Sequence, residues 1–411
     1  MTISNWELEQ AILGRALIDA QDANIICEKL TADDFTSYNC EIFLALHNLN
    51  LRGAVIDYIS LADEHRAITP LPLGPGYITQ LTDHYIAKVS LDQHIQTLKE
   101  TTAARRVQQA LEAGLKTIEA TIEPRRVLDN LTVSVMEAQE YVTPKKQSTH
   151  QEIYERLEDI QTGEREYLLK TGSQVLDAYA PARDELLILA ARPSMGKTAL
   201  ALWWAENLAK FGERVLFVSI EMTVEAMTFR RWARLTGINL TKFRTKGGLS
   251  GEDWAKVGSA INDTQSRSLE IRDDIDSVGQ IISAIQRNPY DVVMVDYVQM
   301  MPTLGRQEYR RELGDICKHL KKHIAKPRKI PTILLSQLKR PESGVPRKPS
   351  MHDLRESGEL EQHADVIWML HKNDISENRV EVLVRKYRNG ATGVVNLDHD
   401  TTTGAYSDER Y

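Results

Sequence analysis

The residues most able to carry chemistry lie in one short stretch, Arg192–Thr198, which reads RPSMGKT. It follows an apolar run, Leu186–Ala191, and precedes a segment with helical spacing. A strand, a tight loop and a helix N-terminus form the setting in which backbone N–H groups converge on a phosphate. There Lys197 would reach the β- and γ-phosphates of a nucleoside triphosphate, and the Thr198 hydroxyl would bind Mg²⁺. The predicted phosphate-binding loop is Ala191, Arg192, Pro193, Ser194, Met195, Gly196, Lys197 and Thr198.

Three polar residues follow other apolar runs and are candidates for the same site. Asp296 ends the run Val292–Asp296, and an aspartate at the tip of a neighbouring strand can hold Mg²⁺. Glu221 follows Val215–Ile220, where a carboxylate could polarise the water that attacks the γ-phosphate. Gln337 follows a third run, Thr332–Ser336, where an amide could bind the γ-phosphate and change the conformation of the next loop in response. A surface or capping role for Asp296, or a plain strand-closing role for Gln337, is the alternative.

Lys386 and Arg388 are two residues apart in an expected strand, so their side chains share one face. Two cations side by side without nearby acids repel each other unless an anion meets them. At the edge of a ring subunit they could reach the triphosphate of a neighbour and stabilise the transition state in trans. The alternative is an exposed edge strand that is protected by charge. The spacing does not decide between the two.

Two polar segments are rich in Lys and Arg and are long enough to be functional loops. Lys339–Gly358 contains Arg340 and Arg355, and Gly305–Arg311 contains Arg306. Loops of this kind can follow a phosphate backbone. Neither segment interleaves aromatic residues, so contact with the backbone of a nucleic acid is expected rather than base stacking. A solvated basic helix is the alternative for this charge.

Composition describes an ordinary globular chain of 411 residues, with 42% hydrophobic and 27% charged residues and a net charge of −7. The charge is uneven, because residues 301–350 hold 13 Lys and Arg against four Asp and Glu. The three cysteines show no C-x-x-C spacing, which indicates neither a zinc site nor a disulfide framework and fits a reducing cytoplasm. We expect no signal peptide, no transmembrane helix and no membrane partner.

The texture of the sequence divides the chain into three parts. Residues 1–142 show helical spacing, with breaks at the Pro/Gly cluster 70–76 and at Pro124. Residues 143–170 form a linker in which Thr149–Glu152 resembles a capping box before a short helix. That helix carries Ile153, Leu157 and Ile160 on one stripe, which packs on its own domain or docks on a neighbouring subunit.

From residue 171 to residue 411, strands alternate with helices, as in an α/β nucleotide-binding domain. The main expected helices are Thr198–Lys210 and Arg310–Lys322, and Asn389-Gly390 predicts a hairpin between the last two strands. The expected strands are Leu186–Ala191, Val215–Ile220, Val292–Val298, Thr332–Ser336, Val366–Leu370, Val380–Arg388 and Val394–Asp398.

Together these motifs resemble a known family. In chain order the segments LAARPSMGKTALAL, FVSIEM, VVMVDYVQMM, LLSQLKR, HDLRESGELEQHADVIWML and VRKYRNGATG are similar to the replicative DNA helicases of the DnaB type. ELEQAILGRAL and DDFTSYNCEIFLAL resemble the helical N-terminal domain of that family. The fold expected from this resemblance is a RecA-like P-loop NTPase domain, preceded by an all-α domain and a linker helix. The short chain fits a version encoded by a phage or plasmid.

The resemblance also implies a function. It implies a homohexameric ring around single-stranded DNA that hydrolyses ATP with Mg²⁺ and unwinds duplex in the 5′→3′ direction. It implies Glu221 as catalytic base, Asp296 on Mg²⁺, Gln337 coupling nucleotide to DNA, and Lys386 and Arg388 at the ATP of the neighbour.

In the same family picture, the loop that grips the DNA backbone matches Arg355, Glu356 and Gly358. Primase and a helicase loader are the implied partners. The alternatives are a RecA-type recombinase and a non-unwinding ring component that recruits replication factors. The absence of a cysteine-rich zinc module before the motor argues against a fused primase.

Overall fold

The computed structural model describes residues 3–69, 76–84, 91–121, 124–143, 150–162, 168–296, 298–301, 309–339, 347–373 and 378–409. The chain forms two compact units, Met1–Gln147 and Ser148–Tyr411. Among the described helices, none combines the length and the apolar character that crossing a bilayer requires.

The N-terminal unit is helical, as the sequence predicts. The apolar faces of its shorter helices meet in one core that includes Ile12, Leu13, Ile42 and Phe43, all fully or almost fully buried. The shorter helices are α1 (Trp6–Ile18), α2 (Ala20–Lys29), α3 (Tyr38–Leu51), α4 (Tyr58–Ile68) and α5 (Tyr77–Leu81), with 3-10 turns at Ala32–Asp34 and Thr82–His84.

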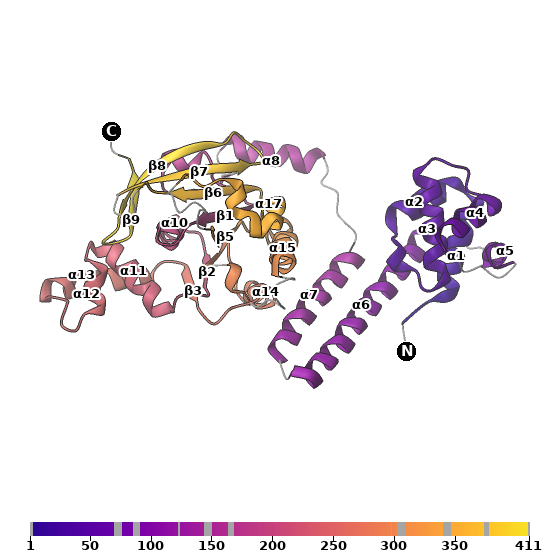
Figure 1. Ribbon diagram of the computed structural model, residues 1–411, viewed down its shortest axis with the longest axis horizontal. Helices are drawn as coiled ribbons and strands as arrows, with labels where there is room; N and C mark the ends of the chain where they lie inside the picture. Colours follow the sequence, from indigo (N-terminus) through magenta and orange to yellow (C-terminus); the bar gives the residue numbers. More distant parts are fainter. Residues whose placement is uncertain are drawn as a thin grey trace. The chain divides into compact units, whose positions relative to one another are not determined.

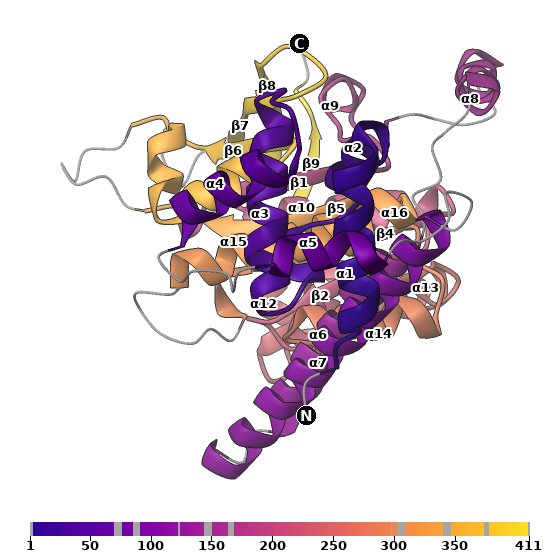
Figure 2. The same cartoon turned by 90° about the vertical axis from the view of Figure 1, so that its right-hand side faces the viewer.

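Two longer helices complete this unit. α6 (Leu91–Thr121) and α7 (Pro124–Val142) lie side by side in Figures 1 and 2, and the second doubles back along the first. The predicted break at Pro124 is confirmed, since proline fits the first turn of a helix. Gly114 lets the helices approach closely, because a Cβ there would lie 2.7 Å from Val127 Cγ1.

A mixed sheet organises the C-terminal unit (Figure 1). Its order is β3-β2-β4-β5-β1-β6-β7-β8-β9, parallel from β3 to β6 and antiparallel from β6 to β9. The strands are β1 (Leu186–Ala191), β2 (Val215–Ser219), β3 (Leu269–Arg272), β4 (Val292–Asp296), β5 (Thr332–Gln337), β6 (Val366–His371), β7 (Arg379–Tyr387), β8 (Gly393–Asp400) and β9 (Ala405–Asp408).

The continuous apolar strands are buried because helices cover the parallel sheet. Every residue of β1, β2, β4 and β6 is buried, and Trp204 stacks on Trp368 with ring centroids 5.1 Å apart. The longer helices are α10 (Lys197–Lys210), α11 (Val224–Thr236), α13 (Gly251–Gln265), α14 (Val278–Arg287) and α15 (Tyr309–Leu320). The shorter helices are α9 (Gln174–Asp177), α12 (Leu240–Arg244), α16 (Lys326–Arg328) and α17 (Gly358–His363).

Most of the expected strands are confirmed, and the hairpin at Asn389-Gly390 joins β7 to β8. The expected strand Val292–Val298 is too long, since β4 ends at Asp296 and Val298–Met300 form a 3-10 turn. Two short strands, β3 and β9, were not expected. Each has only four residues, and pairing with a neighbouring strand, rather than its own pattern, defines it.

The predicted linker helix is present as α8 (His150–Thr162). Of its predicted stripe, Ile153 and Leu157 are each more than half exposed and Ile160 is partly buried, and the neighbouring Tyr154 is also more than half exposed. The expected break at 70–75, the linker residues 144–148 and the capping residue Thr149 lie outside the described residues.

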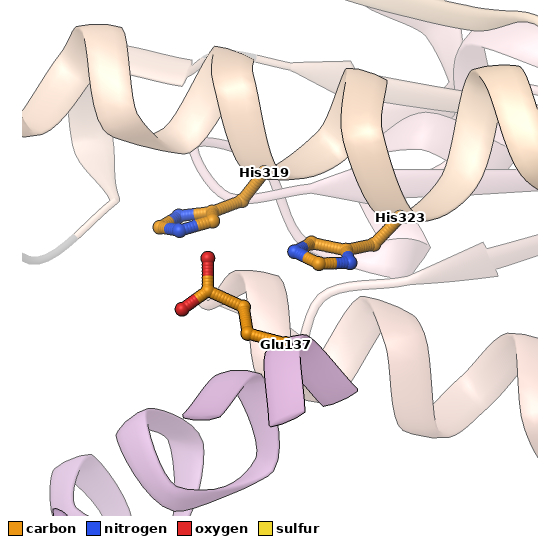
Figure 3. A group of neighbouring side chains, drawn as sticks. All are labelled: Glu137, His319 and His323. Carbon is orange, nitrogen blue, oxygen red and sulfur yellow. The ribbon is translucent and has the colours of Figure 1, made fainter. Parts of the chain in front are cut away.

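α15 runs into a π-helical turn, Lys321–Ala325, which changes the direction of the side chains at its end. His319 and His323 from this continuous helix stack, with ring centroids 5.7 Å apart (Figure 3). Glu137 in that view belongs to α7 of the other unit. Lys321 places its ammonium 2.6 Å from Asp365 Oδ1, just before β6. The turn thus ties α15 to the sheet.

Candidate active site

The loop after β1 has the backbone that a phosphate-binding loop needs. Ser194 and Gly196 have φ angles of 65° and 92°, and Gly196 caps the N-terminus of α10. A Cβ at Gly196 would lie 2.3 Å from the Tyr406 hydroxyl, so glycine is required there for space as well as for conformation. α10 begins at Lys197, and its first N–H groups are therefore available to an anion.

Lys197 and Thr198 both meet Asp296. The Thr198 hydroxyl donates a 2.5 Å hydrogen bond to Asp296 Oδ2, and Lys197 Nζ lies 3.3 Å from Asp296 Oδ1. Burial lowers the pKa of Lys197, and the Asp296 and Glu221 carboxylates oppose that shift. Asp296 is 1% exposed, and within the described part of the chain its Oδ1 has the ion pair with Lys197 but accepts no hydrogen bond. A buried, incompletely satisfied carboxylate beside a hydroxyl is a donor set that fits Mg²⁺.

Asp296 does not lie on a strand next to β1, contrary to the expectation. β5 pairs with both β1 and β4 and therefore lies between them. The contact with Lys197 and Thr198 forms because the carboxyl ends of the parallel strands open on the same edge of the sheet, where ligands of such folds bind.

A cavity of about 680 Å³ opens at this edge. Glu221, after β2, and Gln337, at the end of β5, both line it. The predicted loop residues on the wall are Ala191, Arg192, Pro193, Ser194, Gly196, Lys197 and Thr198. Met195 differs, because it packs against the hydrophobic core of the sheet.

Two arginines of α11 also line the cavity and were not predicted. Arg230 and Arg234 are largely buried, and Arg230 Nε has no hydrogen-bond partner among the described residues. Burial, followed by the proximity of Arg244, lowers the pKa of Arg230. In the sequence both residues fit an amphipathic helix, so no local signal separates them from surface arginines.

The turn between β8 and β9 closes the cavity from a distant part of the chain. His399, Thr401, Thr403 and Gly404 line it. The Tyr406 hydroxyl donates to the Gly196 carbonyl at 3.1 Å, and its ring stacks on His399 with centroids 4.3 Å apart.

His399 is held neutral in this wall. Burial, together with the Lys372 ammonium, lowers the pKa of His399 to about 4. Lys372 Nζ lies 3.0 Å from His399 Nδ1, which accepts its hydrogen bond when the ring is neutral.

Lys386 and Arg388 lie elsewhere, against the C-terminal end of α17. Lys386 Nζ donates to the Glu361 carbonyl at 2.6 Å, and Arg388 donates to the Gln362 carbonyl at 2.9 Å. Burial, and then Arg388, lower the pKa of Lys386.

The structure contradicts one premise and the alternative that were considered for this pair. An acid is close, because Asp365 Oδ1 lies 3.4 Å from an Arg388 guanidinium nitrogen. The alternative of an exposed edge strand does not hold, because β7 pairs with both β6 and β8. β7 ends at Tyr387, so Arg388 follows the strand instead of belonging to it. The cations therefore do not simply repel each other on an open edge.

The expected DNA-contacting residues lie in two groups. Arg306 and Arg340 fall outside the described residues. Arg355 and Glu356 belong to the 3-10 segment Met351–Ser357, and Gly358 begins α17.

Two further cations of the basic loop are neutralised by acids. Arg347 pairs with Asp353 at 2.6 Å and Lys348 with Glu381 at 2.8 Å. The basic character of this segment is therefore smaller than its composition indicates.

The parallel sheet, the phosphate-binding loop and the acid at the tip of β4 define a P-loop ATPase with a RecA-like fold. Residues 169–408 match the model of the DnaB-like helicase C terminal domain, and residues 2–100 match that of the DnaB-like helicase N terminal domain. The chain belongs to the DnaB-like family of replicative DNA helicases and is an ATP-dependent DNA helicase.

Curated relatives and solved structures agree with this assignment. The chain is 30% identical to the replicative DNA helicase DnaC of Bacillus subtilis (strain 168), over 96% of this chain and 92% of the relative. It is also 30% identical to the replicative DNA helicase DnaB of Geobacillus stearothermophilus, over 95% and 91%.

Two solved structures extend the match to the fold. A structure described as a DnaB-like replicative helicase and its interactions with primase superposes with a TM-score of 0.60 and 28% identity, covering 99% of this chain and all of that one. A second solved structure, described as an ATPase domain, superposes with a TM-score of 0.59 and 30% identity, covering 65% of this chain and all of that one. Helicase membership thus displaces the recombinase and recruitment alternatives.

Proposed function

We propose that this helicase binds ATP in the cavity at the carboxyl edge of the sheet and uses its hydrolysis to move along single-stranded DNA. The observation that carries the proposal is that Lys197 and Thr198, which line a 680 Å³ cavity, both contact the buried Asp296 behind them. A cavity of that size suits a nucleotide.

The residues divide the chemistry among them. The oxygen of a water attacks the γ-phosphorus, the bond to the β,γ-bridging oxygen breaks, and ADP leaves with that oxygen. Glu221 accepts the proton of the water as general base. Lys197 and Arg230 offset negative charge on the phosphates, the first as the loop lysine and the second from α11. Mg²⁺, when bound, neutralises further phosphate charge, and Thr198 and Asp296 are the residues that would hold it.

A ring accounts for two surface features of the C-terminal unit. α8 exposes Ile153, Tyr154 and Leu157 on a helix with four acids and one arginine. A small apolar groove of about 220 Å³ lies between α11, α12 and α13, where Trp254 is 62% exposed. Lys242 lines it and pairs with Asp253 at 3.0 Å, and Arg244 and Lys246 lie close by in the sequence.

An exposed apolar stripe on a helix and an exposed apolar groove are complementary. When two different surfaces of one chain fit each other, copies associate head to tail, and a ring results if the rotation closes. We infer that α8 docks in this groove of the next subunit in a homohexamer. In that ring, Lys386 and Arg388 reach the ATP of a neighbour.

Single-stranded DNA would pass the segments that carry Arg306, Arg340, Arg355, Glu356 and Gly358. Gln337 lines the nucleotide cavity and immediately precedes this region, so it can report the γ-phosphate to it. Primase is a proposed partner, because the similar helicase structure was described together with primase. A helicase loader is proposed from the resemblance alone, and the cytoplasm is the proposed compartment.

The domain boundaries are part of the same proposal: a helical domain at 1–142, a linker at 143–170 and the motor at 171–411.

Unwinding of a forked DNA duplex tests the function. Wild type should separate the strands only with ATP, and Lys197→Ala should not. Hydrolysis of ATP by wild type without strand separation, with a loader supplied, would contradict the proposal.

A further inference from the structure

Arg192 of the phosphate loop contacts the basic segment Lys339–Gly358, in part through the buried carboxylate of Asp353. Arg192 NH1 donates a 2.7 Å hydrogen bond to the Arg347 carbonyl, and its NH2 lies 3.7 Å from Asp353 Oδ2. Arg192 is 8% exposed and Asp353 7%. Arg192 also lines the nucleotide cavity, so this one side chain contacts both the cavity and the basic segment.

Asp353 in turn organises the segment around it. Its carboxylate accepts two hydrogen bonds from Arg347, at 2.6 and 2.8 Å, and one from the Ser350 N–H at 2.9 Å. Its carbonyl accepts a long 3.4 Å bond from the Lys339 N–H. Lys339 and Arg347, the described residues on either side of positions 340–346, are thus both hydrogen-bonded to Asp353.

The same region is attached to the phosphate loop a second time. The Leu338 N–H donates to the Ala191 carbonyl at 2.9 Å, at the point where β5 runs beside β1. The described residues on either side of positions 340–346 are therefore both linked to the phosphate loop, Leu338 directly and Arg347 and Asp353 through Arg192. A displacement of Arg192 would move Arg347 and Asp353 with it.

The hydrogen bonding of Arg192 is incomplete. Among the described residues, its Nε and NH2 have no hydrogen-bond partner, although both are buried. A buried guanidinium with unused donors is unfavourable, and a small shift toward Asp353 or toward an anion in the cavity would satisfy them. The two arrangements differ in where the segment lies, which is the condition for coupling two sites.

We propose that Asp353 is a positioning residue that, with Arg192, transmits the occupancy of the nucleotide site to the DNA-binding segment. This rests on the proposed function, in which that segment contacts single-stranded DNA. The route differs from that of Gln337, because it passes through Arg192 and enters the segment at Arg347–Asp353.

The test is a comparison of wild type with Asp353→Asn, which keeps the size of the side chain and removes its charge. The affinity for single-stranded DNA is measured with and without a non-hydrolysable ATP analogue, on hexamers verified by native mass spectrometry. The ratio of the two affinities measures the coupling, and linkage requires the same ratio for the effect of DNA on the analogue. We expect the variant to lose about fivefold or more of that ratio while its DNA-independent ATP hydrolysis stays close to wild type.

Lys348→Gln is the matched control. It removes one charge from the same segment, and its partner Glu381 lies outside the Arg192–Asp353 contact. It should weaken DNA binding in both states and leave the ratio unchanged. If Asp353→Asn fails to form hexamers, Arg347→Lys, which breaks the paired hydrogen bonds but keeps the charge, replaces it. An unchanged ratio in a folded variant would overturn the inference, whereas wild type that binds no single-stranded DNA would overturn the proposed function instead.

Discussion

Arg388 lies 3.4 Å from Asp365, a buried carboxylate that also accepts the N–H of Leu186 at the first residue of β1. Lys321 donates to the same carboxylate. Arg388, the arginine expected to act in trans, therefore lies near the first residue of β1, the strand that leads to the phosphate loop of its own subunit. It also contacts the end of α17, the helix that begins at Gly358 in the segment proposed to contact DNA. In the proposed ring, one side chain would thus lie between the ATP of the neighbour and the proposed DNA-contacting segment of its own subunit.

Arg388→Ala should lower ATP hydrolysis by about 10³-fold, the scale of an arginine finger. The sharper test mixes Arg388→Ala with Lys197→Ala, each inactive alone. In mixed rings, a subunit with an intact phosphate loop can receive Arg388 from a Lys197→Ala neighbour, so part of the activity should return. Recovery of ATP hydrolysis shows action in trans. No recovery in rings verified to be mixed would mean that Arg388 acts within its own subunit.

Glu221→Gln should separate hydrolysis from binding. The amide cannot accept the proton of the attacking water, so the rate constant for hydrolysis should fall by about 10²–10⁴-fold. ATP affinity, measured with a fluorescent analogue, should remain within a few-fold because Lys197 and the loop are intact. Lys197→Ala is the comparison variant, and its affinity for ATP should fall. Loss of affinity in Glu221→Gln would assign that carboxylate to binding rather than to catalysis.

Leu157→Glu should dissociate the ring. The substitution places a charge on the exposed stripe of α8, which we propose fills the groove of the next subunit. Loss of one buried leucine, about 1.5–3 kcal/mol, raises the concentration needed for assembly by about tenfold or more. Light scattering after size-exclusion chromatography measures the assembly. Val175→Glu, at another half-exposed apolar residue of this unit, is the control and should leave the ring intact.

The C-terminal unit should lose stability as the pH falls from about 6.5 to about 4. His399 is neutral when folded, with a pKa lowered to about 4 from 6.5. Between these values the unfolded chain binds a proton that the folded chain does not, so the free energy of unfolding decreases as the pH falls, by up to about 3 kcal/mol. His399→Asn keeps an acceptor for Lys372 and should remove this part of the pH dependence in urea unfolding. His352→Asn, at an exposed histidine of the same unit, should not.

Glu206→Ala should destabilise the C-terminal unit by about 3–5 kcal/mol. Glu206 is fully buried on α10 and pairs with Arg231 and Arg267, with Arg234 3.7 Å away. Removing the acid leaves these cations buried without their common partner. Urea unfolding measures the change, and Glu225→Ala, which removes an exposed acid of α11, should change stability by less than about 0.5 kcal/mol.

The central part of the fold was predictable because its signals are local. β1 and β2 are unbroken apolar runs, and the loop between β1 and α10 contains its own glycine, lysine and threonine. Pairing order is not local, which explains why Asp296 was expected beside β1 although β5 lies between them. The meeting of Asp296 with Lys197 was nevertheless implied, because parallel strands share one ligand-binding edge.

Residues that complete the site from elsewhere in the sequence were not predictable. Arg230 is one of several arginines on an amphipathic helix, and only the fold turns it toward the cavity. Asp365 lies next to Arg388 because β6 and β7 pair, and the sequence around either residue contains no pattern that predicts this ion pair. β9 reads AYSD, which has no strand periodicity, yet it carries Tyr406 to the phosphate loop.

The bond from Tyr406 to Gly196 joins positions that are 210 residues apart. During translation, the ribosome therefore makes the phosphate loop long before it makes the wall that closes the nucleotide cavity. A nascent chain that has not yet released β9 lacks His399, Tyr406 and the turn between them at this site. The order of synthesis thus delays a finished ATP site until the motor is almost complete, and a subunit whose synthesis stops early would enter a ring, if at all, without one.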